Sequence, residues 1–173
     1  YCWGWNSGGG VGNGINNGGC TTTPVKILSN VKQMCFDTNV KTAITEDGEL
    51  YGWGELACLG MRTSTQYTTT PTKIRDEIKQ VALTDSCSVM LTEEGDVYTA
   101  GSNSNGKVGN GSKESWVYEP QKIMSDVEQV YASTAFNVMA VTRKGDLYSW
   151  GFNDYGQVGN GSKEDQLTPV KIL

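Results

Sequence analysis

A seven-residue motif recurs along the chain at nearly constant spacing. Its complete copies are Gly48–Gly54, Gly95–Gly101 and Gly145–Gly151, and residues 1–4 match the tail of the same motif. The last glycines of successive copies are separated by 50, 47 and 50 residues. A fixed period of this length indicates one supersecondary unit that cannot bury its apolar face alone. Such a unit must stack on its neighbours, so the repeat predicts an array of similar modules.

Each repeat contains four short runs with the character of β-strands. In residues 31–75, Val31–Phe36 and Val40–Thr45 are rich in apolar and β-branched residues. Glu49–Trp53 follows an Asp-Gly pair typical of a tight hairpin turn, and it alternates polar and apolar side chains with a period of two. A fourth strand is expected to begin at Pro71, because the first position of a strand tolerates a missing N–H.

Four antiparallel strands in a unit of this length, without a window of helical periodicity, are typical of a β-propeller blade. We therefore predict an all-β chain that forms one partial β-propeller domain over residues 1–173, with about three and a half four-stranded blades. The expected units are the end of a blade at 1–28 and complete blades at 31–75, 78–124 and 127–173.

The loop after the third strand of each repeat is rich in glycine at fixed offsets. Gly101–Gly111 and Gly151–Gly161 share the same spacing, and so do residues 4–14. We expect the recurring glycines to have positive φ angles or to lie where a side chain would clash. These structural glycines are Gly4, Gly54, Gly101, Gly151, Gly109 and Gly159. A phosphate-binding loop is disfavoured, because these loops open no helix and carry no recurring Lys-Ser or Lys-Thr pair.

Composition and charge argue against several classes of function. A net charge of −5 with scattered basic residues disfavours nucleic acid as a partner, because phosphate contacts need clustered Lys and Arg. The chain has no histidine and no Cys-x-x-Cys pair, so we expect no metal site. Without a nucleophile elbow or a paired catalytic carboxylate, we predict no catalytic residues, no cofactor and no enzymatic activity.

The absence of a long apolar span predicts no membrane contact. The five cysteines are irregularly spaced, and we expect them to be reduced and to behave as small apolar residues. A set of reduced cysteines favours an intracellular, cytoplasmic location.

Residues 145–173 carry the fullest copy of a longer pattern. It reads Gly-Asp-Leu-Tyr-x-Trp-Gly-x-Asn-x-x-Gly-Gln-Val-Gly-x-Gly, followed by Thr-Pro-Val-Lys-Ile. This pattern resembles the repeat of the regulator of chromosome condensation family, and the resemblance covers essentially the whole chain. It implies a seven-bladed propeller. Similar propellers act as exchange factors for the small GTPase Ran, as modules of large ubiquitin ligases and as scaffolds, so the resemblance implies no single activity.

The chain departs from the family pattern at several positions. Ala100 stands where the sister repeats have tryptophan, and the loop Glu55–Met61 lacks two residues and the Asn-Gly pair. Where family repeats usually have a histidine entering the second strand, this chain has Val40, Cys87 and Phe136. These departures indicate a divergent member of the family.

Counting half-repeats gives three and a half blades, so a seven-bladed ring would need as many again. An arc of this kind exposes an open strand edge at each end, and open edges promote pairing with further strands. We therefore expect the chain to be a fragment of a polypeptide about twice as long, or a part of a larger assembly.

We predict a non-enzymatic protein–protein interaction propeller or scaffold module with protein partners of unknown identity. Loops on a rigid scaffold are where binding concentrates, and the most irregular segments are Arg62–Thr69 and Ser112–Glu119. In the second segment, Trp116 and Tyr118 are candidate partner contacts, and packing on their own blade is the alternative. Tryptophans at the repeated strand position are expected in the blade core: Trp3, Trp53 and Trp150.

The resemblance alone implies an alternative function, which is guanine nucleotide exchange on a Ran-like small GTPase. Such a protein would displace a bound nucleotide without making or breaking a covalent bond.

Overall fold

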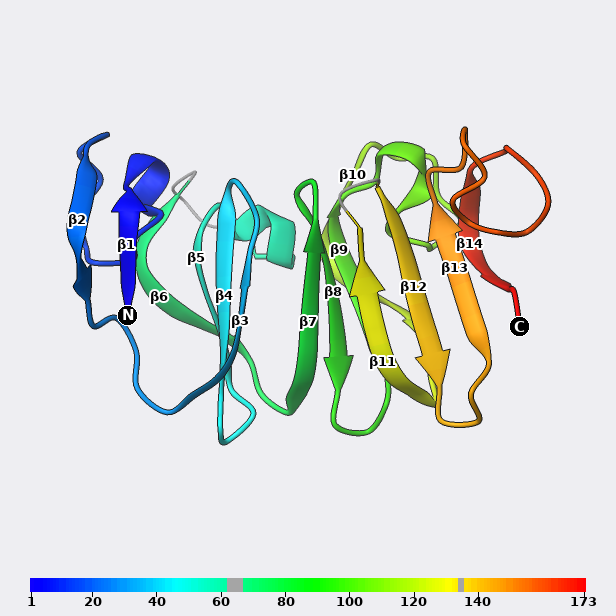
Figure 1. Ribbon diagram of the computed structural model, residues 1–173, viewed down its shortest axis with the longest axis horizontal. Coiled ribbons are helices and arrows are strands. Elements are labelled where there is room, and N and C mark those ends of the chain that lie inside the picture. Colours follow the sequence, from blue (N-terminus) through cyan, green and yellow to red (C-terminus); the bar gives the residue numbers. More distant parts are fainter. Residues whose placement is uncertain (62–66, 134–135) are drawn as a thin grey trace.

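The structure is a computed structural model that describes residues 1–61, 67–133 and 136–173. It is an arc of β-sheets that stand side by side, one two-stranded and three four-stranded (Figure 1). Within each four-stranded sheet the strands follow the order of the chain, and each pairs with the next in antiparallel fashion. The predicted all-β propeller of about three and a half blades is therefore confirmed.

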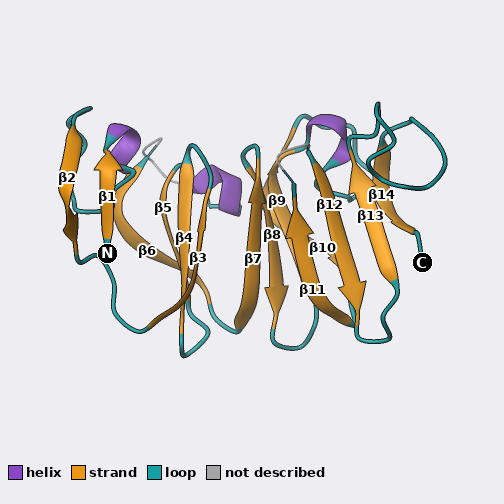
Figure 2. Ribbon diagram, viewed as in Figure 1, coloured by secondary structure: helices purple, strands orange, loops and turns teal. Residues whose placement is uncertain are grey.

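The half blade contains β1 (Cys2–Trp5) and β2 (Cys20–Val25). The first complete blade contains β3 (Val31–Phe36), β4 (Val40–Thr45), β5 (Leu50–Gly54) and β6 (Thr68–Arg75). The second contains β7 (Ile78–Thr84), β8 (Cys87–Thr92), β9 (Val97–Ser102) and β10 (Trp116–Met124). The third contains β11 (Val127–Ala132), β12 (Asn137–Thr142), β13 (Leu147–Gly151) and β14 (Gln166–Lys171). Three short 3-10 helices follow third strands (Figure 2): η1 (Ser7–Gly9), η2 (Leu56–Leu59) and η3 (Ser104–Gly106).

Two sets of turns define two faces of the arc (Figure 1). The turns from β4 to β5, β8 to β9 and β12 to β13 lie at the lower end in this view, and each contains a glycine with positive φ. The 3-10 helices and the turns from β3 to β4 and β7 to β8 lie at the upper end. We call the upper end the loop face, formed by residues 6–19, 37–39, 85–86, 103–115 and 152–165, and the lower end the opposite face.

The fourth strands begin earlier than the sequence predicts. Pro71, Pro120 and Pro169 lie inside β6, β10 and β14 instead of at their first residues. Each of these strands is an edge of its sheet, so a missing N–H breaks no interior ladder. In β10 the register with β9 also shifts between Val117 and Gln121, on either side of the proline. An edge strand with an irregular register accommodates proline without loss of pairing elsewhere.

The first strands of successive blades lie next to one another, since β7 contacts both β3 and β11. Side-chain amides connect them although they belong to different sheets. The Nε2 of Gln33 donates to the carbonyl oxygen of Val81 at 3.2 Å, and the Nε2 of Gln80 donates to the carbonyl oxygen of Val130 at 2.7 Å. The backbone N–H of Val130 returns a hydrogen bond to the Oε1 of Gln80 at 3.1 Å. These bonds hold successive blades at a fixed relative position.

The apolar core is distributed between the sheets. One cluster joins the second and third blades, and its buried members are Val89, Leu91, Val97, Val127, Val130, Val138, Ala140 and Trp150. A second joins the first and second blades through Ile44, Leu50, Ile78, Val81 and Met90. A third joins the half blade to the first blade through Cys2, Val11, Ala43 and Trp53. Each blade therefore depends on its neighbour for burial of its apolar face.

Two of the repeated tryptophans are buried between blades, and the loop of the preceding blade covers each. The indole Nε1 of Trp53 donates to the carbonyl oxygen of Gly10 at 3.1 Å, and that of Trp150 donates to the carbonyl oxygen of Lys107 at 3.0 Å. The prediction that all three repeated tryptophans lie in the core is wrong for Trp3. It is 62% exposed, because no described element packs over the half blade.

Ala100 and the shortened loop Glu55–Met61 are two departures from the repeat that lie next to each other in the structure. The shortened loop of the first blade contains η2, and unlike the glycine-rich helices η1 and η3 it carries large apolar side chains, Leu56, Cys58 and Leu59, which are fully buried. This helix contacts β9, the strand that carries Ala100. A Cβ atom on the next residue, Gly101, would lie 3.1 Å from the carbonyl oxygen of Cys58. The helix thus fills the space beside β9, and an alanine fits there where a tryptophan would overpack.

Candidate functional site

The two faces of the arc differ in how their charges are paired. On the opposite face, Lys79 lies 2.6 Å from Glu128 and Lys122 lies 2.6 Å from Asp96. The other pairs at that face are Lys32–Glu93, Lys73–Glu49, Lys73–Asp76, Arg143–Asp126, Arg143–Glu128 and Lys171–Asp146. On the loop face, Lys41 forms no ion pair with any described residue. The loop face therefore has charge that remains available to a ligand.

A buried ion pair supports the loop face between the second and third blades. The Lys107 side chain is fully buried, and its ammonium donates to the carboxylate and the carbonyl oxygen of Asp85 at 2.6 and 2.9 Å. The ammonium also lies 5.2 Å from the ring centroid of Phe136. That ring packs edge-to-face on Phe152, which packs in the same way on Tyr155. Tyr155, the last of these three rings, is 84% exposed to solvent on the loop face.

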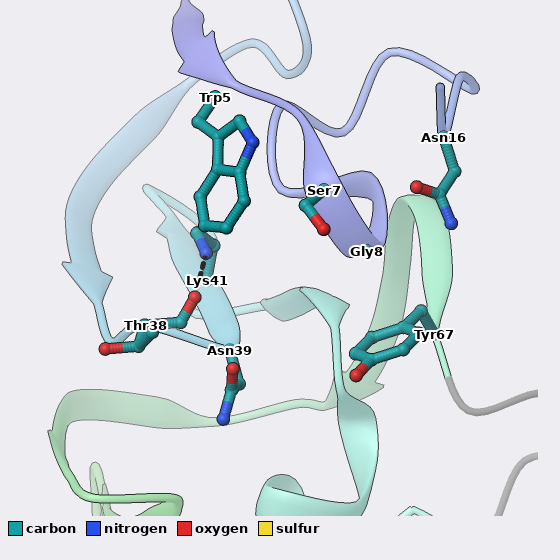
Figure 3. Close-up of a pocket in the computed structure, with 8 residues that line it drawn as sticks. All are labelled: Trp5, Ser7, Gly8, Asn16, Thr38, Asn39, Lys41 and Tyr67. Carbon is teal, nitrogen blue, oxygen red and sulfur yellow. Dashed lines mark hydrogen bonds between the residues drawn. The ribbon is translucent and has the colours of Figure 1, made fainter. Parts of the chain in front are cut away.

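A cavity of about 310 Å³ opens on the loop face between the half blade and the first blade (Figure 3). Trp5 and Lys41 lie on one side of it, and Asn16 and Tyr67 lie on the other. The turn between β3 and β4 forms its floor. The complete lining is Trp5, Ser7, Gly8, Asn16, Thr38, Asn39, Lys41 and Tyr67. We call this space the Lys41 cavity.

Lys41 reaches the cavity because of its place in the sheet. It lies on β4 directly opposite Trp53 of β5, at a register position where the second and third blades have Ser88 and Val138. Those two residues are fully buried. A lysine at this position packs its aliphatic stem between the blades and extends its ammonium toward water. The ammonium donates to the carbonyl oxygen of Thr38 at 2.8 Å.

Burial lowers the pKa of Lys41 below its ordinary value, and the negative charge of Asp37 acts in the opposite direction. Asp37 does not form an ion pair with the lysine, and its carboxylate accepts from two backbone N–H groups. Its Oδ1 accepts from Thr38 at 2.6 Å and its Oδ2 accepts from Ser86 at 2.8 Å. The ammonium is therefore partly desolvated and has a single acceptor among the described residues.

A second cavity of about 440 Å³ shares Trp5 and Lys41 with the first. Its other side chains are mainly apolar: Tyr1, Cys2, Trp3, Met34 and Phe36. The Lys41 side chain thus lines both a polar cavity and a largely apolar one. This arrangement suits recognition of a group that is charged at one end and apolar beside it.

The structure places the two candidate contacts from the sequence in a strand, although the segment was predicted as a loop. Trp116 begins β10 and packs against the cluster of Val40, Leu56, Cys58 and Leu59. Tyr118 is 46% exposed, and its ring centroid lies 5.9 Å from that of Trp116. Neither residue lines the Lys41 cavity. Of the other irregular segment, Arg62–Thr69, residues 62–66 lie outside the described residues, and Tyr67 lines the cavity.

The recurring glycines keep the loop face compact. Gly4, Gly54, Gly101, Gly151, Gly109 and Gly159 have φ angles of +109°, +86°, +107°, +100°, +81° and +83°. A Cβ atom on Gly54 would collide with the carbonyl oxygen of Asn39, which lies in the turn below the Lys41 cavity. Backbone geometry of this kind is open to glycine and strained for other residues.

The chemistry that this site offers is hydrogen bonding and charge. Among the described residues, no cluster of acidic, Cys or His side chains could hold a metal ion, and no helix is long and apolar enough to cross a membrane. Sequence reasoning missed Lys41 and Trp5. The available signal was a lysine inside a β-branched run where the other repeats have Ser88 and Val138.

Two protein-family models match the chain, and both describe the regulator of chromosome condensation (RCC1) repeat. One matches residues 94–140 and 144–173, and the other matches 78–107 and 127–157. Together they cover more than half of the chain. No curated protein sequence gives a significant match.

Several solved structures have the same fold. Human WBSCR16 is 25% identical, with a TM-score of 0.83 over 99% of this chain and 47% of that one. Prp20p from Saccharomyces cerevisiae, whose structure was described with its binding properties to Gsp1p and histones, is 22% identical. Its TM-score is 0.75 over 99% of this chain and 46% of that one. The chain thus spans about half the length of the structures that it matches.

Proposed function

The chain belongs to the regulator of chromosome condensation (RCC1) repeat family, and on that premise we propose that it is a non-enzymatic protein-interaction propeller whose loop face contacts the partner. The blades act as a rigid scaffold, and the loops carry the residues that differ between repeats. The partner is a protein whose identity the fold does not specify.

The two faces differ in the pairing of their basic side chains, and this difference favours the loop face as the contact surface. Most basic side chains of the opposite face form ion pairs within or between blades, with Lys144 as an exception, whereas on the loop face Lys41 forms no ion pair with any described residue and Tyr155 is 84% exposed. A basic side chain that is already paired within the chain must give up that ion pair to form one with a partner, so it adds little net affinity. Exposed aromatic side chains and an available cation are the groups that carry interface energy. The asymmetry between the faces therefore supports the loop face as the contact surface.

The proposal of a non-enzymatic role rests on side-chain chemistry. The chain has no histidine, and burial raises the pKa of both Cys58 and Cys87 to about 12, which keeps these thiols protonated at neutral pH. We further propose an intracellular location, which the five free cysteines support.

Affinity capture with paired surface variants tests the proposal. We expect Tyr155→Ser to reduce the recovery of bound proteins severalfold, because it removes an exposed aromatic contact and leaves the core intact. Lys144→Ala is the matched control, since Lys144 is an exposed residue of the turn from β12 to β13 on the opposite face. Loss of partners with Lys144→Ala, and not with loop-face variants, would assign binding to the other face.

Guanine nucleotide exchange on a Ran-like small GTPase is the alternative function. It is supported by the likeness to Prp20p, a protein whose structure was described with its binding properties to Gsp1p. The test is the release of labelled GDP from such a GTPase in the presence of the chain. The interaction proposal predicts no change from the spontaneous rate, and acceleration of more than about tenfold would favour exchange.

A further inference from the structure

We infer that the Lys41 cavity receives one carboxylate, the side chain of an Asp or Glu residue of the partner protein. This inference rests on the proposed function, because it specifies what the loop face recognises. It is carried by the donors that line the cavity, by the lack of an acidic residue in its described lining and by the aromatic side chains at its rim (Figure 3).

The Lys41 ammonium has hydrogen-bond donors that no described residue uses. An ammonium group has three N–H donors, and among the described residues this one donates only to the carbonyl oxygen of Thr38. The nearby Asp37 carboxylate accepts from the backbone N–H groups of Thr38 and Ser86, and it forms no ion pair with Lys41. The unused N–H donors of Lys41 are therefore available to an acceptor on a bound ligand.

The other polar residues of the cavity favour an anion as that acceptor. Ser7 offers a hydroxyl donor, and Asn16 and Asn39 offer amide N–H groups. None of the described residues that line the cavity is acidic. A carboxylate bound there would accept a charge-assisted hydrogen bond from Lys41 and neutral bonds from its neighbours, which is a stronger combination than neutral bonds alone.

The charge of the cavity favours a carboxylate over a phosphate. Its described lining contains one cation and no arginine, whereas phosphate groups carry nearly two charges and are bound by clustered, bidentate arginine side chains. One lysine balances the single charge of an Asp or Glu side chain. A bound carboxylate would also favour the charged form of Lys41. Its negative charge raises the pKa of the lysine, whereas burial lowers it.

The aromatic rim favours a protein as the source of the carboxylate. Trp5 is 69% exposed at one side of the cavity, and Tyr67 lies across from it (Figure 3). The ring of Tyr67 packs on Gly8, where a Cβ atom would lie 3.0 Å from its Cδ1, so the glycine allows this close approach. Aromatic groups beside a buried charge are typical of a protein interface, where they exclude water from the ion pair.

The test is a titration of the full chain, labelled with ¹³C and ¹⁵N at lysine, and followed by NMR at Cε and Nζ. The probes are N-acetylglutamate N-methylamide and its uncharged counterpart N-acetylglutamine N-methylamide. We expect a saturable shift of the Lys41 resonance with the glutamate probe, at a dissociation constant on the order of millimolar, and binding at least about tenfold weaker for the glutamine probe. A Lys41 shift that is linear and equal to that of exposed Lys163 would overturn the inference.

Two variants complete the design. Lys41→Met keeps the aliphatic stem and removes the charge. In uniformly ¹⁵N-labelled samples, we expect the glutamate-specific shifts of the Asn16 and Asn39 amides in the unmutated chain to disappear in this variant. Lys163→Met is the matched control on the same face, because Lys163 is exposed and does not line the cavity, and it should leave these shifts unchanged. The probe comparison in the unmutated chain stands even where a variant fails to fold.

Failure of this inference is distinguishable from failure of the proposed function. A chain that captures partners through the loop face but shows no preference for the glutamate probe would keep the interaction role and lose the carboxylate site. A chain whose captured partners depend on the opposite face would lose the interaction surface, whatever the NMR titration shows.

Discussion

The indole Nε1 of Trp150 donates a 3.0 Å hydrogen bond to the carbonyl oxygen of Lys107, which belongs to the loop of the preceding blade. The loop can approach this closely because Gly109 has no side chain. A Cβ atom there would lie 2.6 Å from the same Nε1. A tryptophan in one blade and a glycine in another therefore depend on each other. The first blade repeats the arrangement: Trp53 donates to the carbonyl oxygen of Gly10, and a Cβ atom on Gly12 would lie 3.0 Å from the Trp53 Nε1.

Trp150→Ala should lower the free energy of unfolding by about 3–5 kcal/mol, because it removes a buried aromatic side chain and leaves a cavity between blades. Trp3→Ala is the control, since Trp3 has the same repeat position and is 62% exposed. It should cost less than about 1 kcal/mol. Urea denaturation followed by circular dichroism measures both, and equal costs would contradict the packing described for Trp150.

Gly109→Ala and Gly161→Ala separate backbone strain from collision. Their φ angles are nearly equal, at +81° and +82°, so alanine is strained to the same degree at both positions. A Cβ atom on Gly161 would have nothing within 4 Å, whereas one on Gly109 would meet the Trp150 indole. We expect Gly109→Ala to be the more destabilising by at least about 1 kcal/mol in the same urea assay. Equal losses would mean that the indole moves aside freely.

Asp85→Asn should destabilise the chain by about 1–2 kcal/mol, because it leaves the buried Lys107 ammonium without its carboxylate. The cost stays below that of a fully buried pair, since the Asp85 side chain is 54% exposed and water can approach. Lys107→Gln, which copies Gln157 of the third blade, should cost less because it removes the charge itself. The reverse order in thermal unfolding would argue against a charge effect.

Alkylation should distinguish the cysteines. Cys20 is exposed and should react with iodoacetamide at pH 8, while Cys58 and Cys87 should react only after unfolding. Burial raises the pKa of both buried thiols to about 12, so the reactive thiolate is scarce as well as inaccessible. Peptide mass spectrometry assigns the sites, and Cys20→Ser should abolish the rapid reaction. Rapid labelling of Cys87 in the folded chain would contradict its burial.

Lys41 should titrate below its ordinary pKa of 10.5, because burial disfavours the charged form. Between the lowered pKa and 10.5 the unfolded chain binds more protons than the folded chain at this site. Its contribution to stability therefore rises as the pH rises through that window. The pH dependence of the ¹³Cε shift measures the pKa directly. Asp37→Asn should lower it further, since the Asp37 charge favours the ammonium, and an increase would contradict that assignment.

The repeat made the fold predictable. The alternation of polar and apolar residues depends on local sequence and reveals the strands, and the constant spacing reveals that similar units stack on one another. The start of the fourth strands was not predictable in this way. Proline has no fixed position along an edge strand, so its place in the sequence did not mark the first residue of β6 or β10. Trp3 was also misplaced, because burial depends on which element lies over a strand and not on the strand itself.

The site was largely invisible to sequence reasoning. Trp5, Lys41 and Tyr67 come from β1, β4 and the segment before β6, and only the stacking of two blades brings them together. The relation between Ala100 and η2 is similar. Each departure was visible as a difference between repeats, but their connection depends on contacts across a blade boundary. The lysine at position 41 was the one readable signal, as a charge where the other repeats have Ser88 and Val138.

The glutamine bridges have a mechanical consequence. Among the described residues they join the first complete blade to the second through Gln33 and Val81, and the second to the third through Gln80 and Val130. Tension applied to the two ends of the polypeptide would load these links in series, one blade boundary after another. Extension should therefore proceed in discrete steps, each releasing a segment of one repeat and lengthening the chain by roughly 15–18 nm. The arc would therefore extend one blade at a time.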